Sequence, residues 1–424
     1  MRKKMIKNPD SFIKTGLLIS MFSISLVYGQ LDSTLVQYGN ALADVNEKKL
    51  YETTVDVMQS YFKDYPDGPQ SADVQWDLAQ FHMKQKKYDR AYVAFLKTAL
   101  LYPDSPNKMK AKEAATAPVT KSSNLKPIKE KLLSLFDGAP EDSTISGRYF
   151  AFLTRLRSLL YPKLNDALIP ECDLFLQLFP EHPDAPQLSQ WMGDMYEEDK
   201  DYWLALASYL RIIHMYPDSD PVLASTVKAA DLYGGKLKEY KHAVAMYKDV
   251  LNSQADSLLR AEAQWNLARI TEEKLLNPSS ASEEYQNLAD HFLFSPNVPE
   301  ALMRKANLQE TRLKQYEGSI TTYRFVTDRF SRDRRAPEAL AKAGEVYEKK
   351  MKDYEKAIQI YIELSDKYTE NSLAVEKLFD AAELAEKKLK DKDRAIALYQ
   401  KVIDAYPKER EAKKAAKKIE SLSK

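Results

Sequence analysis

Glutamate residues recur at a fixed interval in the C-terminal part of the sequence. One set is spaced by 38 residues and consists of Glu272, Glu310, Glu348 and Glu386. If these carboxylates share one surface, they could bind a partner that carries basic or amine groups. The alternative is a solvated face that was copied with each duplication and binds no partner.

Two further charged sets have the same spacing. The acidic set is Glu262, Glu300, Glu338 and Glu376, and the basic set is Lys274, Arg312, Lys350 and Lys388. A helix dipole favours acids in the first turn and bases in the last turn. We therefore predict that these sets lie at helix starts and near helix ends. The Glu272 set comes late in the same helices, where the dipole disfavours an acid, so it is the candidate partner-binding set.

The residue types of catalytic and metal sites form no known motif in this sequence. It contains no phosphate-binding glycine loop, no nucleophile elbow, no paired metal-binding cysteines and no zinc-protease helix motif. The five histidines are far apart and are expected to be structural: His82, His182, His214, His242 and His291. The sequence predicts no catalytic residue, no metal and no cofactor, and hence a protein that is not an enzyme. The alternative is an enzyme whose site is assembled from separate repeats.

The charged sets belong to a longer repeat of small and aromatic residues. In KDYEKAIQIYIELSDKY, residues 352–368, apolar residues recur at helical spacing with charged residues between them. The alanine position of this helix returns as Ala205, Ala243, Ala281, Ser319, Ala357 and Ala395. Four residues later the sequence has Tyr209, Tyr247, Tyr285, Tyr323, Tyr361 and Tyr399. A preceding helix has its own small residue at Ala230, Ala268, Ala306, Gly344 and Ala382.

Each repeat is therefore predicted to be a pair of antiparallel helices. Small side chains allow the two helices to cross closely, and the tyrosine fills the space between neighbouring pairs. Neither helix can bury its apolar face alone, so the pairs must stack into an array. We expect Tyr361 to be buried and Lys356 to be exposed.

About ten such pairs fit between residues 31 and 406. Residues 30–106 are predicted to form N-terminal units, 148–254 central units and 255–406 regular C-terminal units. Residues 107–147 contain three prolines and the polar stretch TKSSN, which predict a degenerate repeat or a loop-rich segment. Residues 407–424 are predicted to form a capping helix on the open end of the array.

Composition supports a helical protein. Glycine accounts for 11 of 424 residues, less than half its usual share of roughly 7%. We therefore expect few positions with the left-handed backbone that tight hairpins and phosphate loops require. The single cysteine, Cys172, lies in an apolar stretch and is predicted to be a buried small residue.

Residues 1–29 have the features of a secretory signal peptide. A basic stretch precedes the apolar run TGLLISMFSISLVY. Val27 and Gly29 are small enough for the two positions before a signal-peptidase cut, so cleavage is expected before Gln30. An uncleaved anchor is the alternative, but the run is shorter than the roughly 20 apolar residues of a spanning helix. Gln30 also stands where a lipid-attachment cysteine would have to be.

The chain that remains after this cleavage is nearly neutral. It has 58 basic and 61 acidic residues, a formal charge of −3. Such a chain is poorly suited to nucleic acid, and no other segment is apolar enough to span a membrane. We expect an exported protein, either periplasmic or associated with an outer membrane.

The small residue of the first helix, the alanine and aromatic pair of the second helix and the proline that ends many second helices resemble the tetratricopeptide repeat. The resemblance covers most of the mature chain, although the 38-residue period exceeds the family's usual length of about 34. It implies an all-α fold, a right-handed α-solenoid of about ten helix pairs. It also implies that the face with the Glu272 set lines a concave groove.

The endings YPDSP and YPDSDP also resemble the repeats of bacterial envelope proteins, such as the outer-membrane assembly lipoprotein BamD and the periplasmic tol-pal coordinator. This resemblance implies a non-catalytic scaffold that holds protein or peptide partners in the cell envelope. A purely structural spacer is the alternative, and its groove would show no coherent charged or apolar strip.

Overall fold

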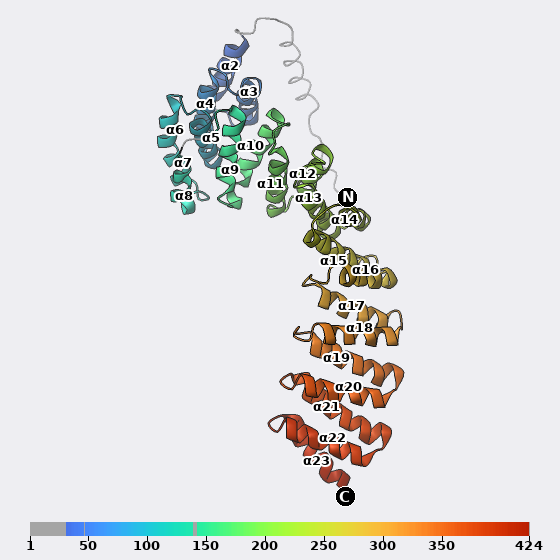
Figure 1. Cartoon of the computed structure of the whole chain (residues 1–424). Coiled ribbons are helices and arrows are strands. Elements are labelled where there is room, and N and C mark those ends of the chain that lie inside the picture. The colour runs from blue at the N-terminus through green and yellow to red at the C-terminus, as the bar shows by residue number, and fades with distance from the viewer. Residues whose placement is uncertain (1–30, 46, 139–141, 424) are drawn as a thin grey trace. The chain divides into compact units, whose positions relative to one another are not determined.

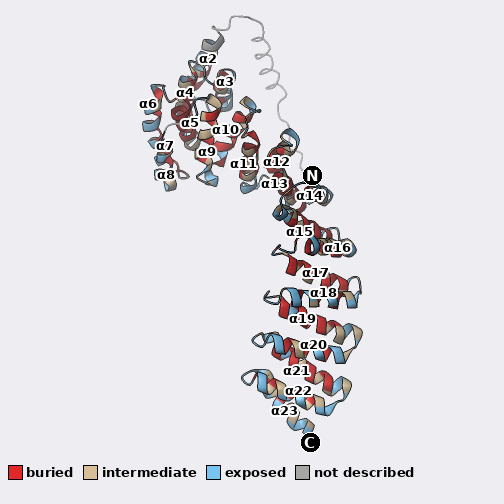
Figure 2. Cartoon of the chain, in the orientation of Figure 1, coloured by how far each residue is buried: buried red, intermediate tan, exposed pale blue. Residues whose placement is uncertain are grey.

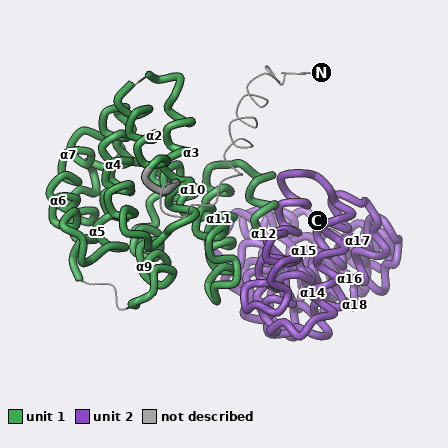
Figure 3. The backbone as a smooth tube through the Cα atoms, turned by 90° about the horizontal axis from the view of Figure 1, so that it is seen from above, with its two compact units in different colours: residues 1–208 green, residues 209–424 purple. Residues whose placement is uncertain are grey.

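The structure is a computed structural model that describes residues 31–45, 47–138 and 142–423. The predicted signal peptide lies outside the described residues. The chain divides into two compact units, which meet in sequence between Ser208 and Tyr209. Figure 3 shows them in separate colours, and each is described by itself.

The helices of unit 1 are short and unequal. They are α2 (Leu31–Val45), η1 (Lys48–Leu50), α3 (Tyr51–Asp64), α4 (Ser71–Lys84), α5 (Tyr88–Leu101), α6 (Asn107–Ala114), α7 (Thr116–Lys121), η2 (Lys126–Ile128), α8 (Lys129–Ser134), α9 (Ile145–Arg157), η3 (Pro162–Leu164), α10 (Asn165–Leu178) and α11 (Ala185–Glu198). Helix α12 (Tyr202–Met215) crosses the division between the units.

Helix α5 is the centre of unit 1. Eleven of its fourteen residues are buried, because α5 packs against α4, α6, α7, α9 and α10. The segment predicted to be a degenerate repeat or loop-rich contains α6, α7 and α8, which have eight, six and six residues. Two of these helices lie on α5, and the regular pairing of helices resumes with α9 and α10.

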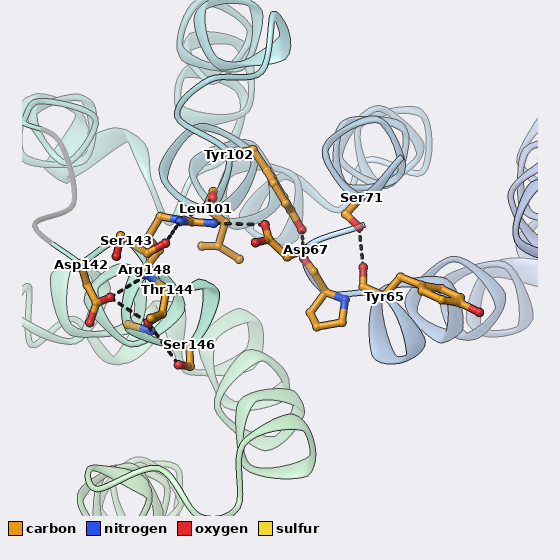
Figure 4. A network of polar contacts seen from close by, with 12 residues as sticks. Tyr65, Asp67, Ser71, Leu101, Tyr102, Asp142, Ser143, Thr144, Ser146 and Arg148 are labelled. Atoms are coloured by element: carbon orange, nitrogen blue, oxygen red, sulfur yellow. Dashed lines mark hydrogen bonds and ion pairs between the residues drawn. The ribbon is translucent and has the colours of Figure 1, made fainter. Parts of the chain in front are cut away.

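Polar contacts join the helix ends of unit 1 (Figure 4). Arg148 of α9 donates from Nε to the carbonyl of Leu101 at 2.7 Å and from Nη2 to Asp67 at 3.1 Å. Tyr102 donates to the carbonyl of Pro66 at 2.8 Å. The side chains of α9 and of the turn after α5 thus hold the turn between α3 and α4.

Unit 2 is regular. After α12 come α13 (Val222–Asp231), η4 (Leu232–Leu237), α14 (Tyr240–Asn252), α15 (Ser257–Glu273), α16 (Pro278–His291), α17 (Val298–Thr311), α18 (Tyr316–Arg329), α19 (Ala336–Glu345), η5 (Val346–Met351), α20 (Tyr354–Lys367), α21 (Ser372–Leu384), η6 (Ala385–Leu389), α22 (Lys392–Ala405) and α23 (Arg410–Ser423). From α13 to α23, each helix packs against the next (Figure 1). The odd-numbered helices from α13 to α21 are the first helices of the pairs, and the even-numbered ones are the second helices.

The core of unit 2 is the predicted apolar stripe. The six tyrosines of the repeat are each at most 3% exposed: Tyr209, Tyr247, Tyr285, Tyr323, Tyr361 and Tyr399. A Cβ atom on Gly344 would lie 2.4 Å from the ring of Tyr361, so a small residue is needed where the helices cross. Lys356 is exposed as expected, and buried residues follow the packed sides of the helices (Figure 2). The predicted all-α solenoid of helix pairs is confirmed.

The expectation of few left-handed residues is wrong. Eight residues other than glycine have φ between 46° and 67°: Lys86, Leu160, Lys200, Lys238, Leu276, Lys314, Lys352 and Lys390. They lie in the turns between first and second helices, and the last six recur every 38 residues. The tight turn between paired helices requires this conformation, and the chain supplies it mainly with lysine rather than glycine.

The last helix, α23, has the features predicted for a capping helix. Helix α23 packs on α22 and α21 and buries Ala412 and Ala415 while its other faces are mostly polar, as a capping helix would. Among the helices of the described residues, none is long and apolar enough to cross a membrane.

Candidate partner-binding face

The predicted partner-binding glutamates accept hydrogen bonds from the buried tyrosines. In each pair the hydroxyl of the second-helix tyrosine donates to the glutamate thirteen residues earlier. The distances are 2.5 Å for Tyr285 and Glu272, 3.5 Å for Tyr323 and Glu310, 2.8 Å for Tyr361 and Glu348, and 2.6 Å for Tyr399 and Glu386. The glutamates therefore have a structural role within their own repeats.

The burial of the tyrosines explains this role. A buried hydroxyl without a partner destabilises a fold by about 1–3 kcal/mol, and a carboxylate is a strong acceptor. Burial, with the hydrogen bond to Glu348, raises the pKa of Tyr361 well above its ordinary value. The tyrosine thus stays a neutral donor. This need accounts for an acid late in each helix, where the dipole is unfavourable.

In the first repeat of unit 2 the hydrogen bond between tyrosine and a carboxylate is kept, although the glutamate position of the repeat is not. There the glutamate position is held by Gly234. The hydroxyl of Tyr247 instead donates to Asp231, one helical turn earlier, and Asn266 donates to the same carboxylate at 3.0 Å. The first helix thus still supplies a carboxylate to the tyrosine, but from a different position.

Basic residues of the same chain lie next to three of the four glutamates. Arg304 lies 3.0 Å from Glu272 and Lys418 lies 3.0 Å from Glu386. Lys350 lies 3.9 Å from Glu310. For Glu348, the described residues place no basic side chain within 4.0 Å. The row of carboxylates is therefore less negative than the sequence alone indicates.

The second glutamate set is only in part at helix starts. Glu300 and Glu338 lie in the first turns of α17 and α19, as predicted. For Glu262 and Glu376 the prediction is wrong, because α15 begins at Ser257 and α21 at Ser372. Both helices start earlier than the repeat pattern indicates, since Asp256 and Asn371 cap them by accepting backbone N–H groups.

Sequence reasoning missed an apolar column on the first helices. Trp265, Met303 and Phe379 occupy equivalent positions of the repeat and are half-buried, and Ala341 between them is buried. Their positions are related by the 38-residue period, which is the signal that could have found them. We call the surface formed by this column, the Glu262 set and the Glu272 set the first-helix face.

Three recesses lie along the first-helix face. The recess beside Trp265 has a volume of about 580 Å³, the one beside Met303 about 530 Å³ and the one beside Phe379 about 830 Å³. Each is lined by one member of the apolar column together with charged side chains. Apolar side chains among polar and charged groups are the usual composition of a protein or peptide binding surface.

The remaining chemical groups agree with a structural role. Cys172 is buried, and burial raises the pKa of its thiol well above the ordinary value. Burial, with the nearby charges of Arg90 and Lys87, lowers the pKa of His82 to about 3. No group of three or more potential metal ligands occurs within the described part of the chain.

Comparison with known families agrees with this fold. The family described as Tetratricopeptide repeat matches residues 338–371 and 378–409, which include most of α19 to α22. This part of unit 2 thus contains tetratricopeptide repeats. The comparison with curated proteins found no match.

Solved structures resemble the chain at low sequence identity. The protein YrrB, a TPR protein with an unusual peptide-binding site, is 18% identical over 47% of this chain and 94% of its own, with a TM-score of 0.34. A tetratricopeptide repeat protein from Parabacteroides merdae is 15% identical over 65% of this chain and 99% of its own, with a TM-score of 0.36. The Naa15/Naa10 structure bound to HypK-THB is 15% identical over 88% of this chain and 52% of its own, with a TM-score of 0.40.

Proposed function

We propose that the protein is an exported, non-catalytic scaffold of the bacterial cell envelope that holds protein or peptide partners on the first-helix face of unit 2. The observation that carries this proposal is the series of three recesses along one face of a tetratricopeptide array. Trp265, Met303 and Phe379 pack against the core and also line the three recesses, an arrangement that a spacer does not need.

The candidate glutamates contribute charge to this face beyond their contacts with tyrosine. Glu272 and Glu386 keep about a fifth of their side-chain surface exposed. A partner that carries basic groups would meet these carboxylates beside the apolar column. We propose that Glu272, Glu310, Glu348 and Glu386 bind the basic groups of such a partner.

The proposed location follows from the sequence of residues 1–29. Periplasmic or outer-membrane-associated protein should be processed, so native protein should begin at or near Gln30. N-terminal sequencing of the purified native protein measures this directly. Retention of Met1 on a cytoplasmic protein would contradict the proposed export.

Affinity capture tests the scaffold function. The mature chain, residues 30–424, is immobilised and incubated with envelope extract, and captured proteins are identified by mass spectrometry. We expect a small set of proteins that the Glu310→Gln/Glu348→Gln variant captures less well. The matched control, Asp249→Asn/Glu283→Gln, removes two exposed carboxylates from second helices and should capture as the parent does.

Stability must be measured alongside capture, because both glutamates accept tyrosine hydroxyl groups. Glutamine keeps an acceptor oxygen, so a loss of roughly 1 kcal/mol per site is expected. Loss of capture by a folded variant, and weaker capture by the parent at high salt, would indicate electrostatic recognition. Failure of the parent to enrich any protein would favour the spacer.

A further inference from the structure

The recess beside Trp265 differs in chemistry from its neighbour beside Met303. Its charged lining residues are Asp256 and Glu262, with no lysine or arginine among the lining residues. The recess beside Met303 is lined by four basic residues, Arg304, Arg334, Arg335 and Lys342, together with three acidic ones, Glu272, Glu300 and Glu338. The two recesses therefore suit partner groups of different charge.

Apolar side chains form the other side of the Trp265 recess. Leu258 is 69% exposed, and Leu259 and Trp265 lie beside it in the lining. On the adjoining turn, Phe294 is 56% exposed. A single exposed leucine is ordinary on a protein surface. A cluster of apolar groups around one recess is typical of an interaction site.

The carboxylates of this recess are not neutralised by the chain itself. In the described residues, no basic side chain lies within 4.0 Å of Glu262 or Asp256. Two arginines lie over the Trp265 ring, Arg269 and Arg304, and both belong to other ion pairs. Arg269 lies 3.6 Å from Glu273, and Arg304 contacts Glu272, Glu273 and Glu300.

The position of Glu262 needs an explanation other than helix capping. Asp256 already caps α15 by accepting the N–H groups of Leu258 and Leu259 at 2.8 and 3.0 Å. Glu262 lies in the second turn and is exposed. One helical turn separates it from Trp265, so both side chains lie on the same side of α15.

We propose that this recess anchors a partner segment in which an apolar or aromatic side chain adjoins a lysine or arginine. The apolar side chain would pack against Leu258, Leu259 and Trp265, and the cation would lie at Glu262. Charge complementarity selects this occupant, because an acidic segment would meet Asp256 and Glu262 without compensation. The inference rests on the proposed scaffold function and names the chemistry of its partner.

The test uses short peptides as probes. An end-capped peptide with Phe next to Lys is titrated into the mature chain, and counterparts carry Glu in place of Lys or Ser in place of Phe. The indole N–H resonance of Trp265, identified by its loss in Trp265→Phe, reports the site. We expect the Phe–Lys peptide to shift this resonance, and both counterparts to bind more weakly.

Variants of the chain measure separately how the charge of Glu262 and the apolar side chain of Leu258 contribute to peptide binding. Glu262→Gln should weaken the Phe–Lys peptide by up to about fivefold, the range of an exposed ion pair. Leu258→Ser should weaken it as well, and the melting temperature of both variants should be that of the parent, since both side chains are exposed. Glu283→Gln is the control and should bind as the parent does.

Several outcomes would overturn the inference. These are equal binding of the Phe–Lys and Phe–Glu peptides, parent-like binding by Glu262→Gln, and no shift at millimolar Phe–Lys peptide. If Glu262→Gln and Leu258→Ser still capture the envelope proteins as the parent does, the anchor site is wrong while the scaffold function stands. If the parent captures nothing, the scaffold function itself is wrong.

Discussion

Both units bury a tyrosine whose hydroxyl donates to a glutamate, but they treat the charge of that glutamate differently. In unit 2 the contact is repeated, the glutamates stay partly exposed, and three of the four lie beside basic residues. In unit 1 the contact occurs between Tyr149 and Glu171, at 2.5 Å, and Lys97 neutralises the pair from within the core at 2.7 Å. The same contact between tyrosine and glutamate thus forms a partly exposed, repeated row in unit 2 and a single buried charged cluster in unit 1.

The unit 1 cluster reverses the roles of the two helices. Glu171 occupies the position 38 residues before Tyr209, so a glutamate stands where the repeat has its second-helix tyrosine. The tyrosine now comes from the first helix, as Tyr149 of α9. The Lys97 side chain is 1% exposed, and its ammonium lies 4.1 Å from the ring centre of Phe62.

The two arrangements differ in how much hydration their charged groups lose on folding. A half-exposed carboxylate keeps part of its hydration, so an ion pair beside it contributes only about 0–1 kcal/mol. A buried ion loses several kcal/mol of hydration, which only a well-placed partner restores. Burial lowers the pKa of Lys97, although Glu171 opposes this shift. The cluster is therefore sensitive to the loss of either partner.

The largest effect is expected from Lys97→Met, which leaves Glu171 buried without its cation. We expect a loss of about 3–5 kcal/mol. Hydrogen exchange of peptides from α5, α9 and α10 measures the loss in unit 1 separately from unit 2. The double variant Lys97→Met/Glu171→Leu should regain much of it, because no unpaired charge is then buried. Equal destabilisation of the double variant would mean that packing, not charge, is the cause.

In unit 2 the ring of the tyrosine should matter more than its hydroxyl. Tyr361→Ala removes a buried aromatic side chain and should cost about 3 kcal/mol or more. Tyr361→Phe removes only the hydroxyl and should cost about 1 kcal/mol, since the Glu348 carboxylate remains within reach of water. Chemical denaturation measures both variants. A parent-like Tyr361→Ala, or a destabilised Lys356→Ala, would contradict the assigned buried face.

Acid should destabilise unit 2 through its half-buried carboxylates. Burial alone would raise the pKa of Glu345, but Lys377, with Lys342 and Lys349, lowers it to about 2. Because this pKa lies below the ordinary value of 4.5, the stabilisation is complete above about pH 4.5 and is lost as the pH falls toward 2. With a fifth of the side chain exposed, solvent screening reduces the effect to about 1–2 kcal/mol.

Glu345→Gln is the variant that isolates this effect. Its free energy of unfolding should vary less with pH between 4.5 and about 2 than that of the parent. Hydrogen exchange of α19 and α21 peptides at several pH values would measure the difference. An unchanged pH profile would show that Lys377 does not hold the carboxylate ionised.

The comparison also explains what could be predicted from the sequence. Tyr361 was predictable as buried, because its position recurs six times and helical geometry assigns it to one face. The bond from Tyr361 to Glu348 was not predicted, although the constant offset of thirteen residues between the two sets is a visible signal. The cluster of Lys97 and Glu171 occurs once in the described residues, so no periodicity reveals it.

The helix boundaries were harder to predict than the helices. The repeat pattern placed Glu262 at a helix start, but the sequence before α15 contains Asp256, a better cap. Leu258 and Trp265 form a recess only because α15 and the turn before α17 lie side by side. Such a surface depends on tertiary packing, which the spacing of residues in one helix does not determine.

The smallest effect, and one that both units should share, concerns the left-handed turn residues. Lys86 of unit 1 and Lys352 of unit 2 have φ of 58° and 59°, a conformation that costs a residue with a Cβ atom about 1–2 kcal/mol. Glycine removes this cost but gains freedom in the unfolded chain, so Lys86→Gly and Lys352→Gly should each stabilise by about 0.5–1 kcal/mol. Lys248→Gly, at an exposed position within α14, should instead destabilise by about 1 kcal/mol. Denaturation midpoints with an unchanged slope provide the measurement. A gain in one unit and a loss in the other would show that the lysine side chain itself stabilises the second turn, and that the two units share only their backbone geometry there.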